Sequence, residues 1–297
     1  MSRTVFDTFF KGTARESLLR TIDLALAEDG PDMTSLAVFS ARDILCARIV
    51  AKEDTLAVGL PIIPMVLQAL DVLETCMIAF DVEEGARVAK GDVVCRLEGP
   101  AVALLRAERV VLNFICHLSG IANLTARYVA ALTGTRIRVL DTRKTLPGLR
   151  YPEKYAVLAG GGCNHRKNLS EMLMLKDNHI DRAGGIPQAM AALRKAYRDA
   201  PESMPPVEIE CRTLAEVAQA VAERPARIMF DNMDPDTMRR AREMVPRDIE
   251  TEASGGVSLD TIAVVAAAGP DFVSVGRITH SAPAADFSMQ LESVRPS

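Results

Sequence analysis

The chain has 297 residues, of which 48% are hydrophobic and 25% charged, values typical of a globular protein with one large or two modest domains. Its formal net charge is −4, its aromatic content is 4% and it has no Trp, which together exclude a broad basic surface with stacking aromatic side chains. We therefore expect no nucleic-acid partner.

The first hundred residues predict a mixed domain of helices and strands. Apolar residues recur at helical spacing over 13–28, and residues 44–51 have the composition of a strand. The proline at position 61 suits the first turn of a helix over 61–70. Apolar and polar residues alternate over 83–100 on both sides of a Lys-Gly-Asp turn, and this pattern predicts a hairpin or a short meander.

Residues 101–132 predict one or two long helices with two overlapping apolar faces, so most of this segment belongs to the core. Arg109 is the charged residue in it that stands out. An arginine on a helix is usually solvated or salt-bridged, so Arg109 alone gives little indication of function.

From residue 137 onward, β-rich runs alternate with helical runs. Six β-rich runs begin roughly 20–35 residues apart, which is the spacing of βα units in a parallel array. They cover residues 138–142, 172–176, 207–210, 227–231, 249–254 and 272–276. Six strands are too few for a complete eight-stranded barrel, so the sequence predicts a smaller or incomplete α/β barrel.

Each of the six runs ends on, or just before, a polar, charged or glycine residue. These residues are Asp141, Lys176, Glu210, Asp231, Ser254 and Gly276. Active sites of such folds gather at the carboxyl ends of parallel strands, where the loops are free to vary. We therefore expect the functional residues at this end of the predicted barrel.

Five basic residues lie within one short segment that includes the first two of these ends. They are Arg143, Lys144, His165, Arg166 and Lys176. Glu210 and Asp231 can neutralise two of them at most, and a buried charge without a partner is costly. The surplus of positive charge predicts a binding site for a small, multiply charged anion.

Glycine turns follow the last two β-rich runs, and both are candidate phosphate sites. The residues concerned are Ser254, Gly255 and Gly256 in the first turn, and Gly276, Thr279 and His280 in the second. A helix predicted over 259–268 would present backbone N–H groups to a phosphate at its start. Phosphate sites built from the final two βα loops recur in barrels, although a single Gly-Gly turn is a common feature.

The cysteines carry no metal-binding pattern. Cys46, Cys76, Cys95, Cys116, Cys163 and Cys211 include no C-x-x-C pair and no Cys/His spacing of a zinc site. The N-terminal residues lack the long apolar stretch of a signal peptide, and no run reaches transmembrane length. We expect reduced thiols, a cytoplasmic location and no membrane partner.

Several motifs together resemble one family. They are AERVVLNFICHLSGIANLT at 107–125, DTRKT and PGLR within 141–150, EKYAV at 153–157, GGG and NHR within 160–166, and KDNHI at 176–180. The chain thereby resembles the quinolinate phosphoribosyltransferases, the carboxylating nicotinate-nucleotide pyrophosphorylases, over nearly its whole length. The resemblance implies an N-terminal α/β sandwich domain at 1–115, joined by 281–297. A catalytic domain at 116–280 would be an incomplete six- or seven-stranded α/β barrel of the type II phosphoribosyltransferase kind.

The resemblance also implies a reaction and a site. Quinolinate and phosphoribosyl pyrophosphate would give nicotinate mononucleotide, pyrophosphate and CO₂, in de novo NAD biosynthesis. The two carboxylates of quinolinate would be held by Arg143, His165, Arg166 and Lys176, with Arg109 from a second subunit. The catalytic residues would be Lys144, Lys176, Glu210 and Asp231. Lys144 would face the pyrophosphate, and Glu210 and Asp231 would hold the ribose hydroxyls and the Mg²⁺ bound to them. The 5′-phosphate would lie against Ser254, Gly255, Gly256, Gly276 and His280. A homodimer with shared sites follows, and a higher oligomer stays open.

Three alternatives remain beside this interpretation. A paralogue associated with molybdenum transport acts on another acid, but it lacks the KDNH pattern that is present here at 176–179. Lys176 could instead form a Schiff base in an aldolase-type barrel. A non-catalytic homologue that only binds a phosphorylated ligand has less need of Glu210 and Asp231. The chain departs from the family's usual residues at Leu158, Asn168 and Glu171, and at Cys116-His117.

Overall fold

The computed structural model describes residues 3–295, which form two compact units. The first unit contains the chain up to Ala126, Thr145–Gly161 and the chain from Ile278 onward. The second contains Arg127–Lys144 and Gly162–Arg277. Residues 116–126 and 145–161 belong to the first unit, as does the C-terminal segment from Ile278 onward.

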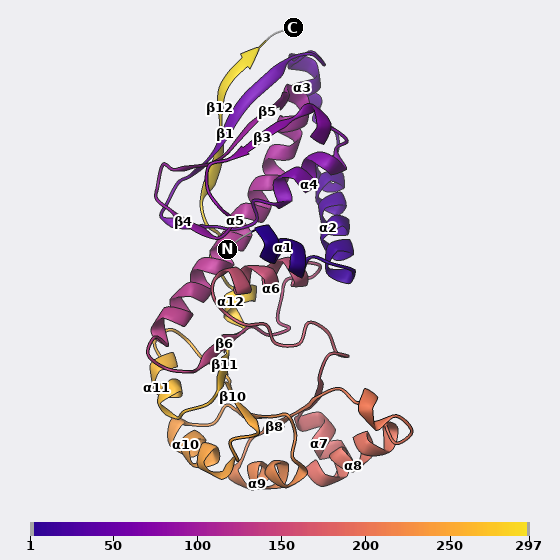
Figure 1. Cartoon of the computed structure of the whole chain (residues 1–297), viewed down its shortest axis with the longest axis vertical. Helices are drawn as coiled ribbons and strands as arrows, with labels where there is room; N and C mark the ends of the chain where they lie inside the picture. Colours follow the sequence, from indigo (N-terminus) through magenta and orange to yellow (C-terminus); the bar gives the residue numbers. More distant parts are fainter. Residues whose placement is uncertain (1–2, 296–297) are drawn as a thin grey trace. The chain divides into compact units, whose positions relative to one another are not determined.

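The first unit is built on a four-stranded antiparallel sheet with the strand order β12-β1-β5-β3 (Figure 1). Its strands are β1 (Ile44–Ala51), β3 (Met77–Phe80), β5 (Val93–Pro100) and β12 (Phe287–Arg295). A separate antiparallel pair joins β2 (Thr55–Ala57) to β4 (Ala86–Val88). The predicted strand at 44–51 is confirmed.

The predicted hairpin at 83–100 is wrong in its pairing. Two strands do flank the Lys-Gly-Asp turn, but β4 pairs with β2, whereas β5 pairs with β1 and β3. The turn is hydrogen-bonded to another part of the chain: the N–H of Gly91 donates to Ala51 O, and that of Lys90 donates to Asp54 Oδ1. The backbone therefore crosses from one sheet to the other at this turn.

The first unit also contains helices, several of which lie beside its four-stranded sheet (Figure 1). They are α1 (Arg3–Phe9), α2 (Thr13–Asp29), α3 (Met33–Val38), α4 (Ile62–Ala69), the 3₁₀ turn η1 (Leu73–Thr75), α5 (Ala101–Ala131), α6 (Arg150–Ala159) and α12 (Arg277–His280). Both α2 and α4 agree with the predicted helices, and α5 is one continuous helix whose last five residues belong to the second unit. The predicted apolar face of α2 is largely buried, at Leu18, Ile22 and Leu26.

An aromatic cluster explains why Thr145–Gly161 packs with the first unit. Tyr155 on α6 is fully buried, with its ring centroid 5.2 Å from that of Phe6 and 5.4 Å from that of Phe10. Its hydroxyl donates to Glu84 Oε1 at 2.9 Å. Glu84 also accepts from the backbone N–H groups that precede α4, so this carboxylate links α6 to the first unit.

The second unit is a six-stranded parallel sheet with the strand order β6-β11-β10-β9-β8-β7. Its strands are β6 (Arg138–Leu140), β7 (Leu173–Leu175), β8 (Val207–Cys211), β9 (Arg227–Asp231), β10 (Glu250–Ser254) and β11 (Phe272–Ser274). All six predicted β-rich runs are confirmed. A parallel bridge between Leu140 and Cys163 extends the array beyond β6, so the unit is an incomplete α/β barrel of six full strands and one partial strand.

Helices connect these strands and form a row along the outer side of the sheet (Figure 1). They are α7 (Asp177–Ala183), α8 (Ile186–Ala196), the 3₁₀ turn η2 (Pro201–Ser203), α9 (Leu214–Glu223), α10 (Pro235–Met244) and α11 (Ile262–Ala267). Each returns the chain to the start of the next parallel strand, which leaves the carboxyl ends of the strands together at one edge.

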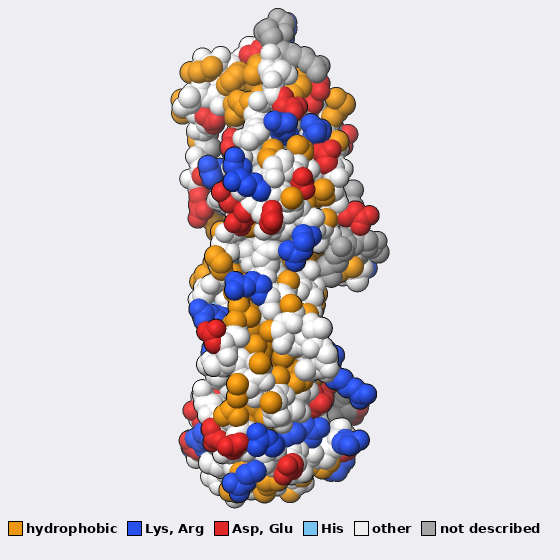
Figure 2. Space-filling model, turned by 90° about the vertical axis from the view of Figure 1, so that its left-hand side faces the viewer, with side chains coloured by type: hydrophobic (Ala, Val, Ile, Leu, Met, Phe, Trp, Pro, Cys, Tyr) orange, Lys and Arg blue, Asp and Glu red, His pale blue; other side chains and the backbone are white. Residues whose placement is uncertain are grey.

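The surface of the protein carries charges of both signs. The face in Figure 2 shows basic and acidic side chains interspersed, with no large area of a single sign. Within residues 3–295, no helix is both long enough and apolar enough to cross a membrane. All six cysteines are free thiols.

Candidate active site

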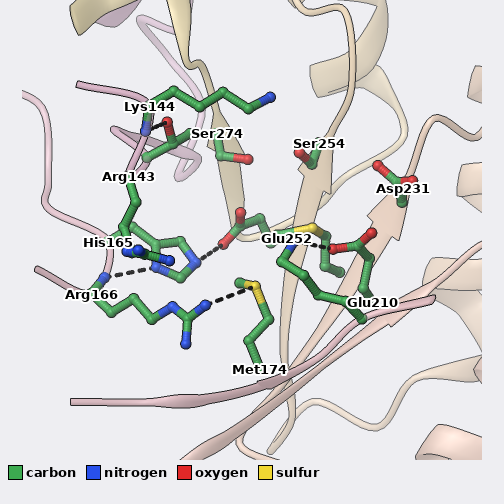
Figure 3. A pocket seen from close by; sticks show the side chains of 13 residues that line it. Arg143, Lys144, His165, Arg166, Met174, Glu210, Asp231, Glu252, Ser254 and Ser274 are labelled. Carbon is green, nitrogen blue, oxygen red and sulfur yellow. Dashed lines mark hydrogen bonds and ion pairs between the residues drawn. The ribbon is translucent and has the colours of Figure 1, made fainter. Parts of the chain in front are cut away.

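A pocket of about 400 Å³ opens at the carboxyl ends of the strands of the second unit (Figure 3). It is lined by Thr142, Arg143, Lys144, His165, Arg166, Met174, Lys176, Glu210, Met229, Asp231, Glu252, Ser254 and Ser274. Eight of these residues were predicted from the sequence, including all five basic residues of the cluster. The structure therefore brings both signs of charge to one cavity.

The strand ends place the acidic residues and Lys176 in the pocket. Glu210 lies near the end of β8, Asp231 and Ser254 are the last residues of β9 and β10, and Lys176 directly follows β7. Lys176 Nζ is 2.7 Å from Glu210 Oε2. The lysine side chain is 43% exposed and the glutamate 12%, so the pair is open to a ligand on the lysine side.

A buried aspartate anchors the segment that carries His165 and Arg166. Asp141, at the end of β6, is fully buried and accepts the N–H of His165 at 2.8 Å and the side-chain amide of Asn164 at 2.7 Å. The adjacent bridge between Leu140 and Cys163 aligns the same segment with the sheet. These contacts hold the N-H-R motif against the edge of the pocket.

The guanidinium of Arg166 is hydrogen-bonded by neutral groups, so its positive charge is not neutralised by these contacts. Its Nη1 donates to Met172 O at 2.8 Å, and its Nη2 lies 3.6 Å from Met174 Sδ. Burial and the nearby Arg143 guanidinium lower the pKa of Arg166. Two guanidinium groups this close repel each other, and an anion between them relieves the repulsion. This part of the pocket is built to bind negative charge.

A layer of buried charged residues lies at and beneath the floor of the pocket, and His165 and Glu252 also belong to its lining. Glu208 and Glu252 are fully buried, and His165 Nε2 is 2.9 Å from Glu208 Oε2 and 3.5 Å from Glu252 Oε2. Arg227 Nη1 donates to Glu252 Oε2 at 2.9 Å, while its Nη2 is 2.8 Å from Oε2 of the exposed Glu250. Burial raises the pKa of the Glu208 and Glu252 carboxyl groups to about 7, and in Glu252 the neighbouring Glu208 adds to this effect.

Sequence reasoning missed this layer, although a signal for it exists. Side chains of a strand alternate between its two faces, so Glu208 shares a face with Glu210, and Glu252 shares one with Ser254. The strand register sets Glu208 beside Arg227. The alternation could have predicted that these charged side chains lie inside the barrel, but it could not have predicted which of them are in contact.

The turn after β10 requires glycine at position 255. Gly255 has φ +107°, and a Cβ there would lie 2.2 Å from Asn232 Oδ1. The N–H of Asn232 in turn donates to Ser254 O, so the turns after β9 and β10 pack together. The predicted helix at 259–268 begins later than expected, at Ile262, because hydrogen bonds between Ser258 and Thr261 form a separate turn first. The helix start is thus not adjacent to the glycine turn.

The remaining predicted residues, including Thr279, do not line the pocket itself. Gly255 and Gly256 directly follow Ser254, and Gly276 follows β11 by two residues. Arg109 is exposed on α5 and His280 is exposed at the end of α12, and both belong to the first unit.

Comparison with known proteins identifies the family. The family described as "Quinolinate phosphoribosyl transferase, N-terminal domain" matches residues 32–119, and the corresponding C-terminal domain family matches residues 121–290. The chain belongs to the quinolinate phosphoribosyltransferase family.

Three relatives of this family show how far the similarity extends. The "Probable nicotinate-nucleotide pyrophosphorylase [carboxylating]" of Bacillus subtilis (strain 168) is 42% identical over 260 residues, which cover 88% of each chain. The nicotinate-nucleotide pyrophosphorylase [carboxylating] of Mycobacterium leprae (strain TN) is 37% identical, over 91% of this chain and 96% of its own. The crystal structure of NadC from Streptococcus pyogenes superposes with a TM-score of 0.86 at 39% identity, over 94% and 96% of the two chains.

Two of the departures from the usual family residues have a local structural role in this member. Asn168 Oδ1 accepts the N–H groups of Ser170 and Glu171, and Glu171 Oε2 accepts the N–H of Lys167 at 2.6 Å. These bonds close a turn directly before β7, away from the pocket lining. Leu158 is half-buried on α6, in the first unit.

The Mg²⁺ implied by the family fits Glu210 and Asp231. Mg²⁺ takes oxygen ligands, often one or two carboxylates together with oxygens of the substrate. Glu210 Oε1 and Asp231 Oδ2 make no hydrogen bond within residues 3–295, so both oxygens are available in the pocket. His165, Glu208 and Glu252 also have ligand atoms within 4.8 Å of one another, but Arg227 already neutralises Glu252 there.

Proposed function

We propose that this protein is a carboxylating nicotinate-nucleotide pyrophosphorylase. It converts quinolinate and phosphoribosyl pyrophosphate to nicotinate mononucleotide, pyrophosphate and CO₂, as a step of de novo NAD biosynthesis. The observation that supports this most strongly is the pocket, in which five basic residues and the carboxylates of Glu210 and Asp231 line one cavity, in a chain that resembles such enzymes along its length.

The cations of the pocket select a small diacid. Arg143, Arg166 and Lys176 all line the pocket and would pair with the two carboxylates of quinolinate. Arginine binds carboxylates through two parallel hydrogen bonds, which fixes the orientation of the ring as well as its position. A monoacid would make only part of these contacts, so it should react less well than the diacid.

The acidic side of the pocket suits the ribose. As pyrophosphate departs, positive charge develops at ribose C1, and the carboxylates of Glu210 and Asp231 would stabilise it. These two residues would also hold Mg²⁺, which when bound neutralises charge on the leaving group. Lys144, which lines the same cavity, would contact the pyrophosphate, and Ser254 with the following glycines would contact the 5′-phosphate.

The reaction then needs mainly positioning. The pyridine nitrogen of quinolinate attacks C1, the bond from C1 to the pyrophosphate oxygen breaks, and its electron pair leaves with pyrophosphate. The resulting pyridinium ring accepts the electron pair of the C2–carboxylate bond as CO₂ departs, and a proton then replaces CO₂ at C2. Holding both substrates in line supplies a large part of the rate enhancement.

The Schiff-base alternative is disfavoured by the ion pair of Lys176. Its Nζ lies 2.7 Å from the Glu210 carboxylate. Lysines that form Schiff bases react as neutral amines, in apolar pockets or next to another cation. Borohydride trapping of a substrate adduct on Lys176 would favour that alternative, and we expect none.

We also propose that the active form is a homodimer in which Arg109 completes the site of the neighbouring subunit. Arg109 is exposed on α5 and makes no hydrogen bond or ion pair within residues 3–295. An exposed cation without a partner is available to a second copy of the chain. A cytoplasmic location would suit the six free thiols.

The proposed function is tested by pyrophosphate release. Purified protein is incubated with phosphoribosyl pyrophosphate and Mg²⁺, with and without quinolinate, and pyrophosphate is measured over time. We expect release that depends on quinolinate. Release with another aromatic acid but not with quinolinate would support the paralogue, and binding of phosphoribosyl pyrophosphate without release would support a non-catalytic homologue.

A further inference from the structure

Each ring nitrogen of His165 lies next to another polar group, and these two neighbours determine the charge of the ring. The backbone N–H of Arg166 donates to His165 Nδ1 at 2.7 Å. Nδ1 therefore presents its lone pair, because a hydrogen on it would face the donor at this distance. The hydrogen then lies on Nε2, which is 2.9 Å from Glu208 Oε2. A ring with one hydrogen, on Nε2, is a neutral imidazole.

Two buried carboxylates lie nearest to this nitrogen, and one of them, that of Glu252, also lines the pocket. Glu208 and Glu252 are fully buried, and the His165 side chain is only 5% exposed. Positive charge in this layer is supplied by Arg227, whose Nη1 donates to Glu252 at 2.9 Å. Figure 3 shows the His165 ring directed toward Glu252, with the Arg166 backbone at its other nitrogen. Neither nitrogen is directed at the cavity.

Arg166 is thereby fixed at two points. Its backbone is bound by His165 Nδ1, and its guanidinium is bound by Met172 O and Met174 Sδ. A guanidinium has five N–H donors, and within residues 3–295 these contacts use two of them. The other three remain for a ligand carboxylate. Arg166 is thus both charged and held in place before a substrate arrives.

We propose that His165 is a neutral positioning residue, instead of one of the cations that bind the substrate carboxylates. It links the buried Glu208 and Glu252 to the Arg166 backbone and so directs the Arg166 guanidinium into the pocket. This inference rests on the proposed function only for the identity of the diacid. It predicts that His165 acts on the substrate entirely through Arg166.

The charge of the ring can be measured without any substrate. In ¹⁵N-labelled protein, a neutral imidazole gives widely separated shifts for its two ring nitrogens, whereas an imidazolium gives two similar shifts. The His165→Gln variant assigns the signals by their loss, and His117→Gln is the matched control, because His117 also lies 2.9 Å from a buried glutamate, in the first unit. We expect separated shifts for His165 at pH 7, with the hydrogen on Nε2. Two similar shifts would overturn the inference.

A double-mutant cycle tests the route through Arg166. We expect His165→Ala to raise KM for quinolinate about tenfold, the effect of one lost hydrogen bond, and less than about twofold in an Arg166→Ala background. His165→Gln, which keeps a donor toward Glu208, should stay within about threefold of wild type. Equal effects of His165→Ala in both backgrounds would show direct contact with substrate and refute the proposal. If wild type does not turn over quinolinate, the proposed function fails, and the nitrogen shifts still decide the role of His165.

Discussion

The buried pair Glu208 and Glu252 should make the protein less stable as the pH rises from 5 to 8.5. Burial raises the pKa of the Glu252 carboxyl from 4.5 to about 7 in the folded protein. A proton is therefore bound more tightly in the folded state, and its stabilising effect is complete below pH 4.5 and is lost as the pH rises through 7. The shift of about 2.5 units corresponds to roughly 3 kcal/mol of unfolding free energy at 1.36 kcal/mol per unit.

Replacing Glu252 by Gln should remove about half of this pH dependence, because the amide needs no proton to stay neutral, whereas Glu208, whose pKa burial also raises to about 7, still titrates. The assay is urea unfolding followed by circular dichroism at pH 5, 6, 7 and 8.5, for wild type and variant. Glu250→Gln is the matched control: it lies on the same strand and pairs with the same Arg227, but it is 47% exposed and should retain the wild-type slope. Equal slopes for wild type and Glu252→Gln would refute the reasoning.

Three further predictions concern the site. Arg143→Ala and Lys176→Ala should each lower kcat/KM at least ~100-fold with an unchanged circular dichroism spectrum, and near-wild-type activity would show that these cations are structural. Gly255→Ala should lower the unfolding temperature and the activity, because its Cβ would lie 2.2 Å from a side-chain oxygen. Gly256→Ala, at φ +57° with open space around it, should have the smaller effect, and the reverse order would contradict this. Mixed Arg109→Ala and Arg143→Ala subunits should recover roughly a quarter of wild-type activity, because about half of the dimers are mixed and each of these has one intact site. No recovery after proven subunit exchange would contradict a shared site.

Hydrophobic periodicity was sufficient to predict the elements that carry the site. The six parallel strands have short β-rich runs with polar ends, and the polar ends of four of them line one pocket. A parallel sheet places such ends at one edge whatever the details of its loops, so Lys176, Glu210, Asp231 and Ser254 could be predicted together. The five-residue basic cluster was found from the concentration of basic residues in one short segment of an otherwise mildly acidic chain.

What the sequence could not supply was pairing between distant residues. The strands at 86–88 and 93–100 look like a hairpin, but they pair with different distant strands, and the Lys-Gly-Asp turn between them is bound to Ala51 and Asp54. The division into units depended on Tyr155, whose packing against Phe6 and Phe10 has no signature in local sequence. Such contacts depend on tertiary packing, which overrides local pattern.

The charge of His165 was also beyond reach of the sequence. A histidine next to an arginine in a basic segment looks like one more cation. Its charge depends on which groups meet its two nitrogens, one from the next residue and one from strands more than forty residues away. Only the folded chain shows that an N–H donor occupies one nitrogen and a carboxylate the other.

The most direct test of the account is the ratio of CO₂ to pyrophosphate released from phosphoribosyl pyrophosphate in the presence of Mg²⁺, compared between quinolinate and nicotinate. The account predicts a ratio of one to one with quinolinate, because each transfer is followed by loss of one carboxylate. It predicts negligible pyrophosphate with nicotinate, which lacks the second carboxylate that the cations of the pocket bind. Equal turnover of the two acids, or pyrophosphate release without CO₂ from quinolinate, would contradict it.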